Sequence, residues 1–256
     1  MNYSGRIYSL LTEAGNLSRF SYRIFTEGIK PRYEISEFLR QCYLVGNKSL
    51  PLSGLTGFIL GLVITIQLRP GLIKYGAEAQ IPYIVSSALI KEIGPIITAL
   101  IFAGKVGSGI GAELGSMKVT EQIDAMEVSG TNPFKYLVVT RVAATTLMFP
   151  LLVLLTDGIS LFGSFLGCNI KAVTSFNLYF GHVFANLTYE VIFPAIIKTV
   201  FFGFAIGLVG CYKGYYTSKG TEGVGRSANS AVVVSSVLIF LIDLIAVQIT
   251  DLLGIY

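Results

Sequence analysis

Five apolar stretches constrain this chain more strongly than any other feature of its sequence, because each is long enough to cross a lipid bilayer. The first is centred on Leu55 to Leu68, and the others run from about residues 82 to 104, 136 to 167, 190 to 212 and 228 to 253. A transmembrane helix needs about 20 mostly apolar residues. Only 13% of the 256 residues are charged, whereas soluble domains average about 25%. The sequence therefore predicts an all-α membrane protein with about five transmembrane helices.

The first 48 residues differ in character from the apolar stretches. They contain seven lysines and arginines, and apolar residues recur between them at every third or fourth position until Pro31. This pattern is typical of an amphipathic helix in the membrane interface, although a cytosolic helix packed on a partner would also show it. We therefore divide the chain into an N-terminal amphipathic interfacial segment, residues 1–48, and a single membrane domain, residues 49–256.

Basic residues indicate how the chain is oriented in the membrane. Besides the N-terminal segment, they gather around residues 105–141 and 213–226, whereas the opposite side has only Arg69, Lys74 and Lys171. Because lysine and arginine are enriched in cytoplasmic loops, we expect the N-terminus in the cytosol and the C-terminus outside. The loop between the second and third spans is then cytosolic.

That loop contains a short amphipathic pattern. Val119, Ile123 and Met126 share one face of a helix, and Gly130 with Asn132-Pro133 ends it. The polar residues facing elsewhere are Thr120, Glu121, Gln122, Asp124 and Glu127. A short cytosolic helix in a tight loop between spans 2 and 3 is suited to receive force from a soluble partner.

A row of small residues precedes this helix. Gly104, Gly107, Gly111 and Gly115 recur at spacings of three and four. On a helix they form one smooth ridge, against which another backbone can pack closely. We predict close helix packing along this ridge.

Besides Lys91, which should point elsewhere or reach the interface, four charged residues lie deep within the predicted spans: Glu92, Asp157, Lys198 and Asp243. A charge at the bilayer centre costs about 2.5–3.5 kcal/mol on the most lenient scale, so each needs a reason. With the topology above, all four lie about 12–16 Å from the outer ends of their spans. We predict that Lys198 approaches Glu92 or Asp243. Such an ion pair would either fix helix packing or form the polar floor of a cavity for the head group of an amphipathic ligand.

Other classes of site are unsupported. His182 is the only histidine and the three cysteines lack metal spacing, so we expect no metal site. No catalytic residues are expected, because no Ser/His/Asp or Cys/His set is present. The net charge of +4 is spread over loops, which argues against nucleic-acid binding.

One segment mimics a nucleotide-binding loop. Residues 220–227 read GTEGVGRS, close to G-x-x-x-x-G-K-[ST], but Arg226 replaces the lysine and no strand precedes the segment. We predict a flexible cytosolic turn here.

The stretch KEIGPIITALIFAGKVGSGIGAELGSMKVTEQIDAMEVSGTNPFKYLVVTR, residues 91–141, resembles the signature region of the MlaE (YrbE) family. Its E-I-G-P, A-G-K-V-G and T-E-Q-I elements together make this resemblance specific, and it extends from about Arg40 to the C-terminus. The family comprises permease subunits of ABC transporters that work with MCE-domain proteins and move phospholipids, or in some lineages sterols, between membranes.

The resemblance implies a homodimer that binds no cofactor itself. A cytosolic ABC ATPase would bind ATP and Mg²⁺ beside each copy, MCE-domain proteins would lie outside, and some systems add a small STAS-domain protein. It further implies a multi-pass protein of a bacterial inner membrane, with an organelle inner envelope less favoured. By position, residues 120–128 resemble the ATPase-coupling helix. Glu92, Lys198 and Asp243 match embedded charges of the family, whereas Asp157 is not part of the pattern.

Two other functions remain open on the sequence alone. An ion-coupled secondary carrier could use Glu92, Asp157 and Asp243 as proton sites, but inverted repeats of the kind common in such carriers are not visible. A scaffold that only tethers an ATPase would not need charges at one depth.

Overall fold

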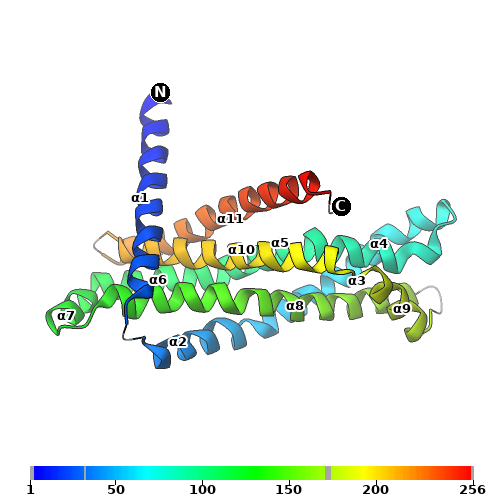
Figure 1. Cartoon of the computed structure of the whole chain (residues 1–256), viewed down its shortest axis with the longest axis horizontal. Helices are drawn as coiled ribbons and strands as arrows, with labels where there is room; N and C mark the ends of the chain where they lie inside the picture. The colour runs from blue at the N-terminus through cyan, green and yellow to red at the C-terminus, as the bar shows by residue number, and fades with distance from the viewer. Residues whose placement is uncertain (1–2, 32, 171–173, 219, 255–256) are drawn as a thin grey trace.

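The computed structural model describes residues 3–31, 33–170, 174–218 and 220–254, and within these residues every regular element is a helix. Most of the helices run side by side along the long axis of the molecule (Figure 1). The short helix α7 (Gln122–Val128) lies at one end of this bundle. At the other end lies α9 (Phe176–Asn186), which connects the third and fourth long helices.

Five helical runs in the described chain are long and apolar enough to cross a membrane, which confirms the predicted spans. They are Ile35–Lys74, Glu78–Val119, Phe134–Asn169, Tyr189–Tyr215 and Thr221–Leu252. Most are longer than a bilayer requires. The chain is therefore a multi-pass membrane protein whose helices extend beyond the hydrocarbon.

The first three runs are composites of shorter elements. The first contains α2 (Ile35–Cys42), the π-helical turn η1 (Tyr43–Asn47) and α3 (Leu50–Lys74). The second contains η2 (Glu78–Gln80), α4 (Ile81–Ala88), η3 (Leu89–Ile93), α5 (Gly94–Phe102), η4 (Ala103–Gly107) and α6 (Ser108–Val119). The third contains η5 (Phe134–Val139) and α8 (Thr140–Asn169). The fourth and fifth runs are the single helices α10 (Tyr189–Tyr215) and α11 (Thr221–Leu252).

Prolines account for some of the wide π-helical turns. Pro95 has no N–H to donate to the carbonyl four residues earlier, and η3 ends just before the Gly94-Pro95 pair. There the amide of Gly94 bonds to the carbonyl of Leu89, five residues back. A π-helical turn in this position is a common response to a lost backbone hydrogen bond and often marks a functional site.

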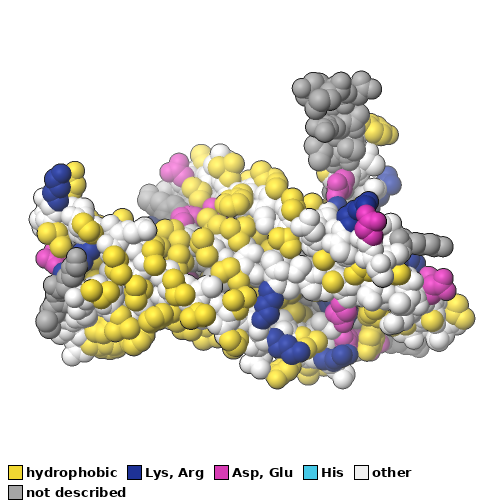
Figure 2. Space-filling model, turned by 180° about the vertical axis from the view of Figure 1, so that it is seen from behind, with side chains coloured by type: hydrophobic (Ala, Val, Ile, Leu, Met, Phe, Trp, Pro, Cys, Tyr) yellow, Lys and Arg dark blue, Asp and Glu magenta, His cyan; other side chains and the backbone are white. Residues whose placement is uncertain are grey.

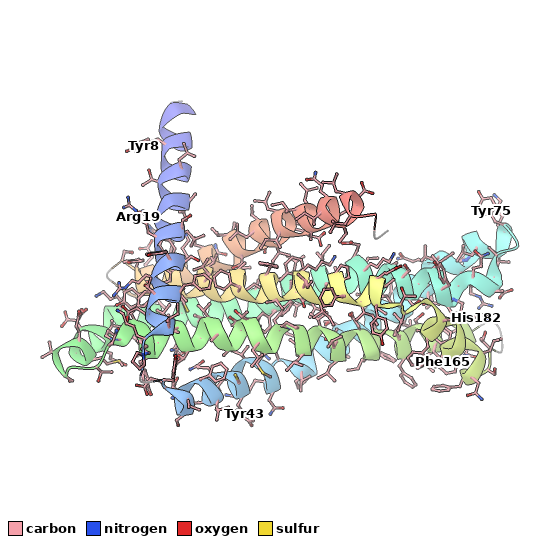
Figure 3. All side chains as sticks on the ribbon, viewed as in Figure 1. Tyr8, Arg19, Tyr43, Tyr75, Phe165 and His182 are labelled. Carbon is pink, nitrogen blue, oxygen red and sulfur yellow. The ribbon has the colours of Figure 1, made fainter. Side chains whose placement is uncertain are left out.

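The N-terminal helix α1 (Tyr3–Ile29) crosses the bundle almost at right angles, near the end that carries α7 (Figure 1). Tyr8 and Arg19 lie on its projecting part, whereas Tyr75 and His182 mark the opposite end of the molecule (Figure 3). A helix perpendicular to the spans has the orientation expected of one lying in the membrane plane. The predicted boundary at residue 48 falls within the first long run, so the division at that point stays a prediction.

The contact between α3 and α8 shows how closely the helices pack. A Cβ atom on Gly61 would collide with the carbonyl oxygen of Ser160, and one on Gly163 would collide with that of Phe58. The two backbones therefore touch directly, as small residues permit in membrane proteins. We call this contact the neutral seam, because glycines and hydroxyl side chains form it.

Two features of the fold differ from expectation. The predicted turn at residues 220–227 is wrong: Gly220 has φ +98°, and helix α11 begins immediately after it at Thr221. A helical segment cannot wrap a phosphate as a nucleotide-binding loop does. Helix α9 was not predicted, and its Tyr179 is fully buried against the bundle.

Figure 2 shows the back of the molecule. A broad band of hydrophobic side chains lies between the end opposite α1 and a group of charged side chains nearer α1. Such a band is what a lipid-facing surface requires.

Candidate functional site

Lys198, Glu92 and Asp243 meet in the middle of the bundle, and we call them the charge cluster. The ammonium of Lys198 lies 2.8 Å from Glu92 Oε2 and 3.0 Å from Asp243 Oδ1. The sequence left open which carboxylate Lys198 would approach, and the structure places both beside it. Since Glu92 lies on η3, Lys198 on α10 and Asp243 on α11, the cluster joins three of the five spans.

The three side chains differ in their exposure. Lys198 is 4% exposed and Asp243 13%, whereas Glu92 is 35% exposed. The cluster is therefore enclosed on the side of α10 and α11 and accessible on the side of the π-helical turn. Two carboxylates around one ammonium give a net negative charge when all are ionised, so the accessible side can attract a cationic or hydrogen-bond-donating group.

Asp157 does not join these ion pairs. Its side chain is buried, and Oδ1 has no hydrogen-bond partner in the described structure. It lies against Gly94 so closely that a Cβ atom there would collide with Oδ1. An unpaired buried carboxylate is costly to ionise. Asp157 therefore packs on the kink beside Glu92 and forms no ion pair with Lys198 in the described structure, although the charge of Lys198 acts on it.

The glycine ridge of α6 packs on two helices. A Cβ atom on Gly107 would lie 3.3 Å from Ile206 of α10, and one on Gly111 would lie 3.3 Å from the carbonyl oxygen of Ser227 in α11. A Cβ atom on Gly115 would lie closer still, 2.9 Å from the hydroxyl of Thr217 and 3.0 Å from that of Ser227. Gly104 is the exception, because a Cβ atom on it would have nothing within 4 Å. The ridge therefore begins at Gly107.

Helix α7 connects to the bundle through α6. Glu121 separates the two helices in the left-handed conformation, with φ +59°, which is uncommon for a residue with a side chain. Thr120 and Glu121 thus form the turn, and the helix itself begins at Gln122. Ile123 is 1% exposed and anchors α7 in the core, while Lys118 of α6 lies 2.7 Å from Asp124.

The outer face of α7 is open. The amphipathic prediction places Gln122 and Glu127 on it, and both are exposed, whereas Met126 packs partly on the core. Gly130, at φ +80°, terminates the helix. A short helix held by one apolar anchor and one ion pair can move as a unit with α6.

Arg141 was missed by the sequence reasoning, which grouped it with the basic loop residues. It is only 2% exposed, and its guanidinium lies 2.9 Å from Glu113 of α6. It also donates a hydrogen bond to the carbonyl of Leu137. The Arg141–Glu113 ion pair connects α8 to α6. The sequence feature that could have indicated it is a basic residue within a mostly apolar stretch.

The described part of the chain has no group of three or more His, Cys, Asp or Glu side chains able to hold a metal ion. The three cysteines are buried as free thiols.

Comparisons with known proteins agree with this arrangement. The family model described as Permease MlaE matches residues 38–249. A probable ABC transporter permease protein of Rickettsia typhi is 39% identical over 227 residues, covering 89% of this chain and 88% of that relative. A probable ABC transporter permease protein of the cyanobacterium Synechocystis is 37% identical, covering 86% of this chain and 83% of its own length. One of the red alga Porphyra purpurea is 36% identical over 202 residues, covering 77% of this chain and 75% of that relative.

The family match includes the charge cluster, the glycine ridge and α7, and the relatives are matched over most of their length. The chain therefore belongs to the MlaE permease family and is a membrane-spanning permease subunit of an ABC transporter.

Proposed function

We propose that this permease moves a lipid, most simply a phospholipid, in traffic between membranes that maintains the lipid content of an outer membrane. Two copies would face each other and enclose an apolar chamber with the charge cluster at its polar floor. The observation that carries this proposal is the cluster itself, because a buried lysine shared by two carboxylates joins three spans and leaves Glu92 accessible. An amphipathic ligand needs mostly apolar walls with a few polar groups to orient its head group.

The packing of α6 supports a route by which force would reach this chamber. An ABC permease works with an ATPase, and α7 is the exposed element at one end of the bundle. Movement of α7 would pass to α6 through Ile123 and the Lys118–Asp124 pair, and from the glycine ridge to α10 and α11. These helices carry Lys198 and Asp243. The affinity of the chamber for lipid would then differ between two states of the complex.

Family membership supports a proposal for the remaining partners. We propose that α7 lies in the cytosol against an ABC ATPase that binds ATP and Mg²⁺, while this chain binds no cofactor. MCE-domain proteins would receive or deliver lipid on the outer side of a bacterial inner membrane, and a small STAS-domain protein would complete some complexes.

The coupling part of the proposal is tested by reversing charge on α7. The permease is reconstituted with its ATPase in lipid vesicles, and ATP hydrolysis and lipid transfer are both measured. We expect Glu121→Lys with Asp124→Lys to abolish transfer while the protein remains folded. Glu222→Lys is the matched control, because Glu222 is an exposed acid that pairs only with Arg226 within one helix of the described chain. Normal coupling in the double variant would refute the assignment of α7.

An ion-coupled carrier is the second candidate, favoured by the excess of carboxylates in the middle of the bundle. It is tested with the permease alone. If vesicles containing this chain without any ATPase moved lipid down an imposed pH gradient, the carrier would replace the ATP-driven proposal. We expect no transfer in the absence of the ATPase.

A further inference from the structure

A large apolar groove lies on the flank of the bundle, and no residue of the charge cluster lines it. Its volume is about 900 Å³, and α1, α2, α8 and α10 line it. Along α8 the lining includes Ala143, Leu147, Leu151 and Leu154, which recur every three or four residues and form one stripe. A second cavity of about 200 Å³ continues from it, because Pro150, Leu154 and Ile196 line both. The groove therefore extends from the α1 end towards the middle of the bundle.

The occupant of this groove must be apolar over most of its length. The groove lies on a surface that faces lipid, so bilayer components are its natural surroundings, and its volume is in the range of about 300–1,000 Å³ that small ligands use. Ile24, Phe25 and Ile29 of α1 line the end of the groove nearest α7. Helix α1 runs across the bundle there (Figure 1), so its side chains cover the groove at this end. An acyl chain can lie beneath α1 without passing through it.

The α1 end of the groove also carries charges that suit a head group. Lys135 lines the groove, and its ammonium donates to the carbonyls of Lys30, at 2.6 Å, and Pro31, at 3.0 Å. A lysine has three N–H donors, so beside these two bonds the third faces the Tyr33 ring, 5.3 Å from the ammonium, or a ligand in the groove. Within the described residues no carboxylate forms an ion pair with Lys135, while Glu34, exposed at the same end, is the acidic residue of the lining. A phosphate beside Lys135 and an amine beside Glu34 would complement both charges.

We propose that this groove binds a zwitterionic membrane phospholipid, with one acyl chain along α8 beneath α1, the phosphate beside Lys135 and the head-group amine beside Glu34. The site is separate from the proposed transport chamber and does not depend on what the chamber carries. The bound lipid would act as a structural ligand that holds α1 and α2 against the bundle.

The test uses phosphatidylethanolamine with a photoactivatable diazirine near the end of one acyl chain, mixed into phosphatidylcholine vesicles that contain the full chain. After illumination, labelled peptides are identified by mass spectrometry. We expect labelling to concentrate at the end of the groove far from Lys135, on Leu151, Leu154 and Ile196. Leu147→Trp should reduce it at least about fivefold, the change that about 1 kcal/mol of weaker binding produces. Leu147 is 54% exposed, so the larger ring extends into the groove and spares the core.

Two matched controls separate a specific site from general lipid contact. Leu55→Trp makes the same change on α3, outside the groove, where Leu55 is 60% exposed, and should leave the labelling unchanged. Lys135→Ala should weaken labelling by the phospholipid probe about fivefold but not labelling by a diacylglycerol probe, which lacks the phosphate. Lys74→Ala, at the opposite end of the bundle, should affect neither probe. Because the amine is placed beside Glu34, a phosphatidylethanolamine probe should label the groove more strongly than a phosphatidylglycerol probe. Glu34→Gln should remove this difference in labelling.

Three results would overturn the proposal. Labelling spread over all lipid-facing helices in proportion to exposure would show that the groove is ordinary boundary surface. Unchanged labelling in a folded Leu147→Trp variant, with an unaltered unfolding temperature, would do the same. Loss of labelling when the chain is purified with its partner subunits would show that a protein segment fills the groove.

Discussion

Two contacts between helices use glycine in the same way but differ in charge. In the neutral seam, α3 and α8 touch through Gly61 and Gly163. In what we call the charged seam, α6 packs by its glycine ridge on α10 and α11, and Lys198 bonds with Asp243 across the latter two. Close backbone approach is common to both, so it does not by itself distinguish a fixed contact from one that moves.

The polar interactions of the neutral seam differ from those of the charged seam. In the neutral seam Ser164 Oγ lies 2.6 Å from Thr65 Oγ1 and accepts a hydrogen bond of 2.6 Å from Tyr179, so three elements share short neutral bonds. Burial raises the pKa of Tyr179 to about 12, so this phenol stays a donor at any physiological pH. The charged seam instead depends on ion pairs whose strength changes with their surroundings. We infer that the neutral seam fixes the fold and that the charged seam carries function.

The largest effect is expected in the charge cluster. Lys198→Met should destabilise the protein by about 3 kcal/mol, the low end for a broken buried pair, because Glu92 is partly accessible. It should also abolish transport. Adding Glu92→Gln and Asp243→Asn to this variant should restore the unfolding temperature, because no unpaired charge remains. Transport should stay abolished. Normal transport by this triple variant would show that the cluster serves packing alone.

A methyl group in the neutral seam should have the next largest effect. Gly61→Ala places a Cβ atom on the carbonyl of Ser160, and such overpacking typically costs about 1–3 kcal/mol. The amount of folded protein in the membrane should fall, whereas transport per folded molecule should not. Gly71→Ala is the control, because a Cβ atom at Gly71 would have nothing within 4 Å. If Gly61→Ala reduced transport per molecule while stability held, the contrast between the seams would fail.

Tyr179→Phe should have a smaller effect of the same kind. Loss of the hydroxyl leaves Ser164 with one hydrogen bond fewer and should cost about 1 kcal/mol. Thermal unfolding in detergent measures this loss, and the transport rate of the folded protein should be unchanged. A changed rate with unchanged stability would place the α9 end of the bundle in the transport cycle.

The smallest expected effect concerns the docking of α1, outside both seams. Glu27 accepts a hydrogen bond from Asn132 at 3.0 Å and pairs with Lys30, and Lys30 holds the pKa of this carboxyl below its ordinary value of 4.5. Lys30 belongs to the same segment as Glu27, so only the hydrogen bond from Asn132, which also lowers the pKa of Glu27, links this carboxylate to docking; that contribution is present at neutral pH and is lost as the pH falls below about 4.5.

Because the pair lies at the surface, Glu27→Gln should weaken docking by only a few tenths of a kcal/mol. Distances between spin labels on α1 and α8 would report it. The variant should lose the acid dependence of docking seen in the unaltered protein, and an acid dependence that persisted would have to arise from another group.

Much of this architecture follows from local sequence. The spans could be predicted because apolar length is a one-dimensional property, and α7 because Ile123 and Met126 share a helical face. The layer of charges was predicted from depth alone, without knowledge of which side chains meet. Contacts across the bundle could not be predicted in this way. The burial of Arg141 depends on Glu113 of another span, and the open position of Gly104 depends on where α10 and α11 lie.

The wide turns within the second span affect how its sequence must be read. A turn with bonds to the fifth residue back accommodates about one residue more than an ordinary helical turn. Counting at 3.6 residues per turn from Glu92 to the glycines of α6 therefore accumulates an angular error at η3 and again at η4. Removal of one residue from Leu89–Ile93 would convert the wide turn to an ordinary one and keep α4 and α5 in phase, whereas insertion of a further residue would rotate one relative to the other by roughly 100°. Insertions, which surface loops tolerate, thus disrupt this stretch through its angular phase and not through its hydrophobicity.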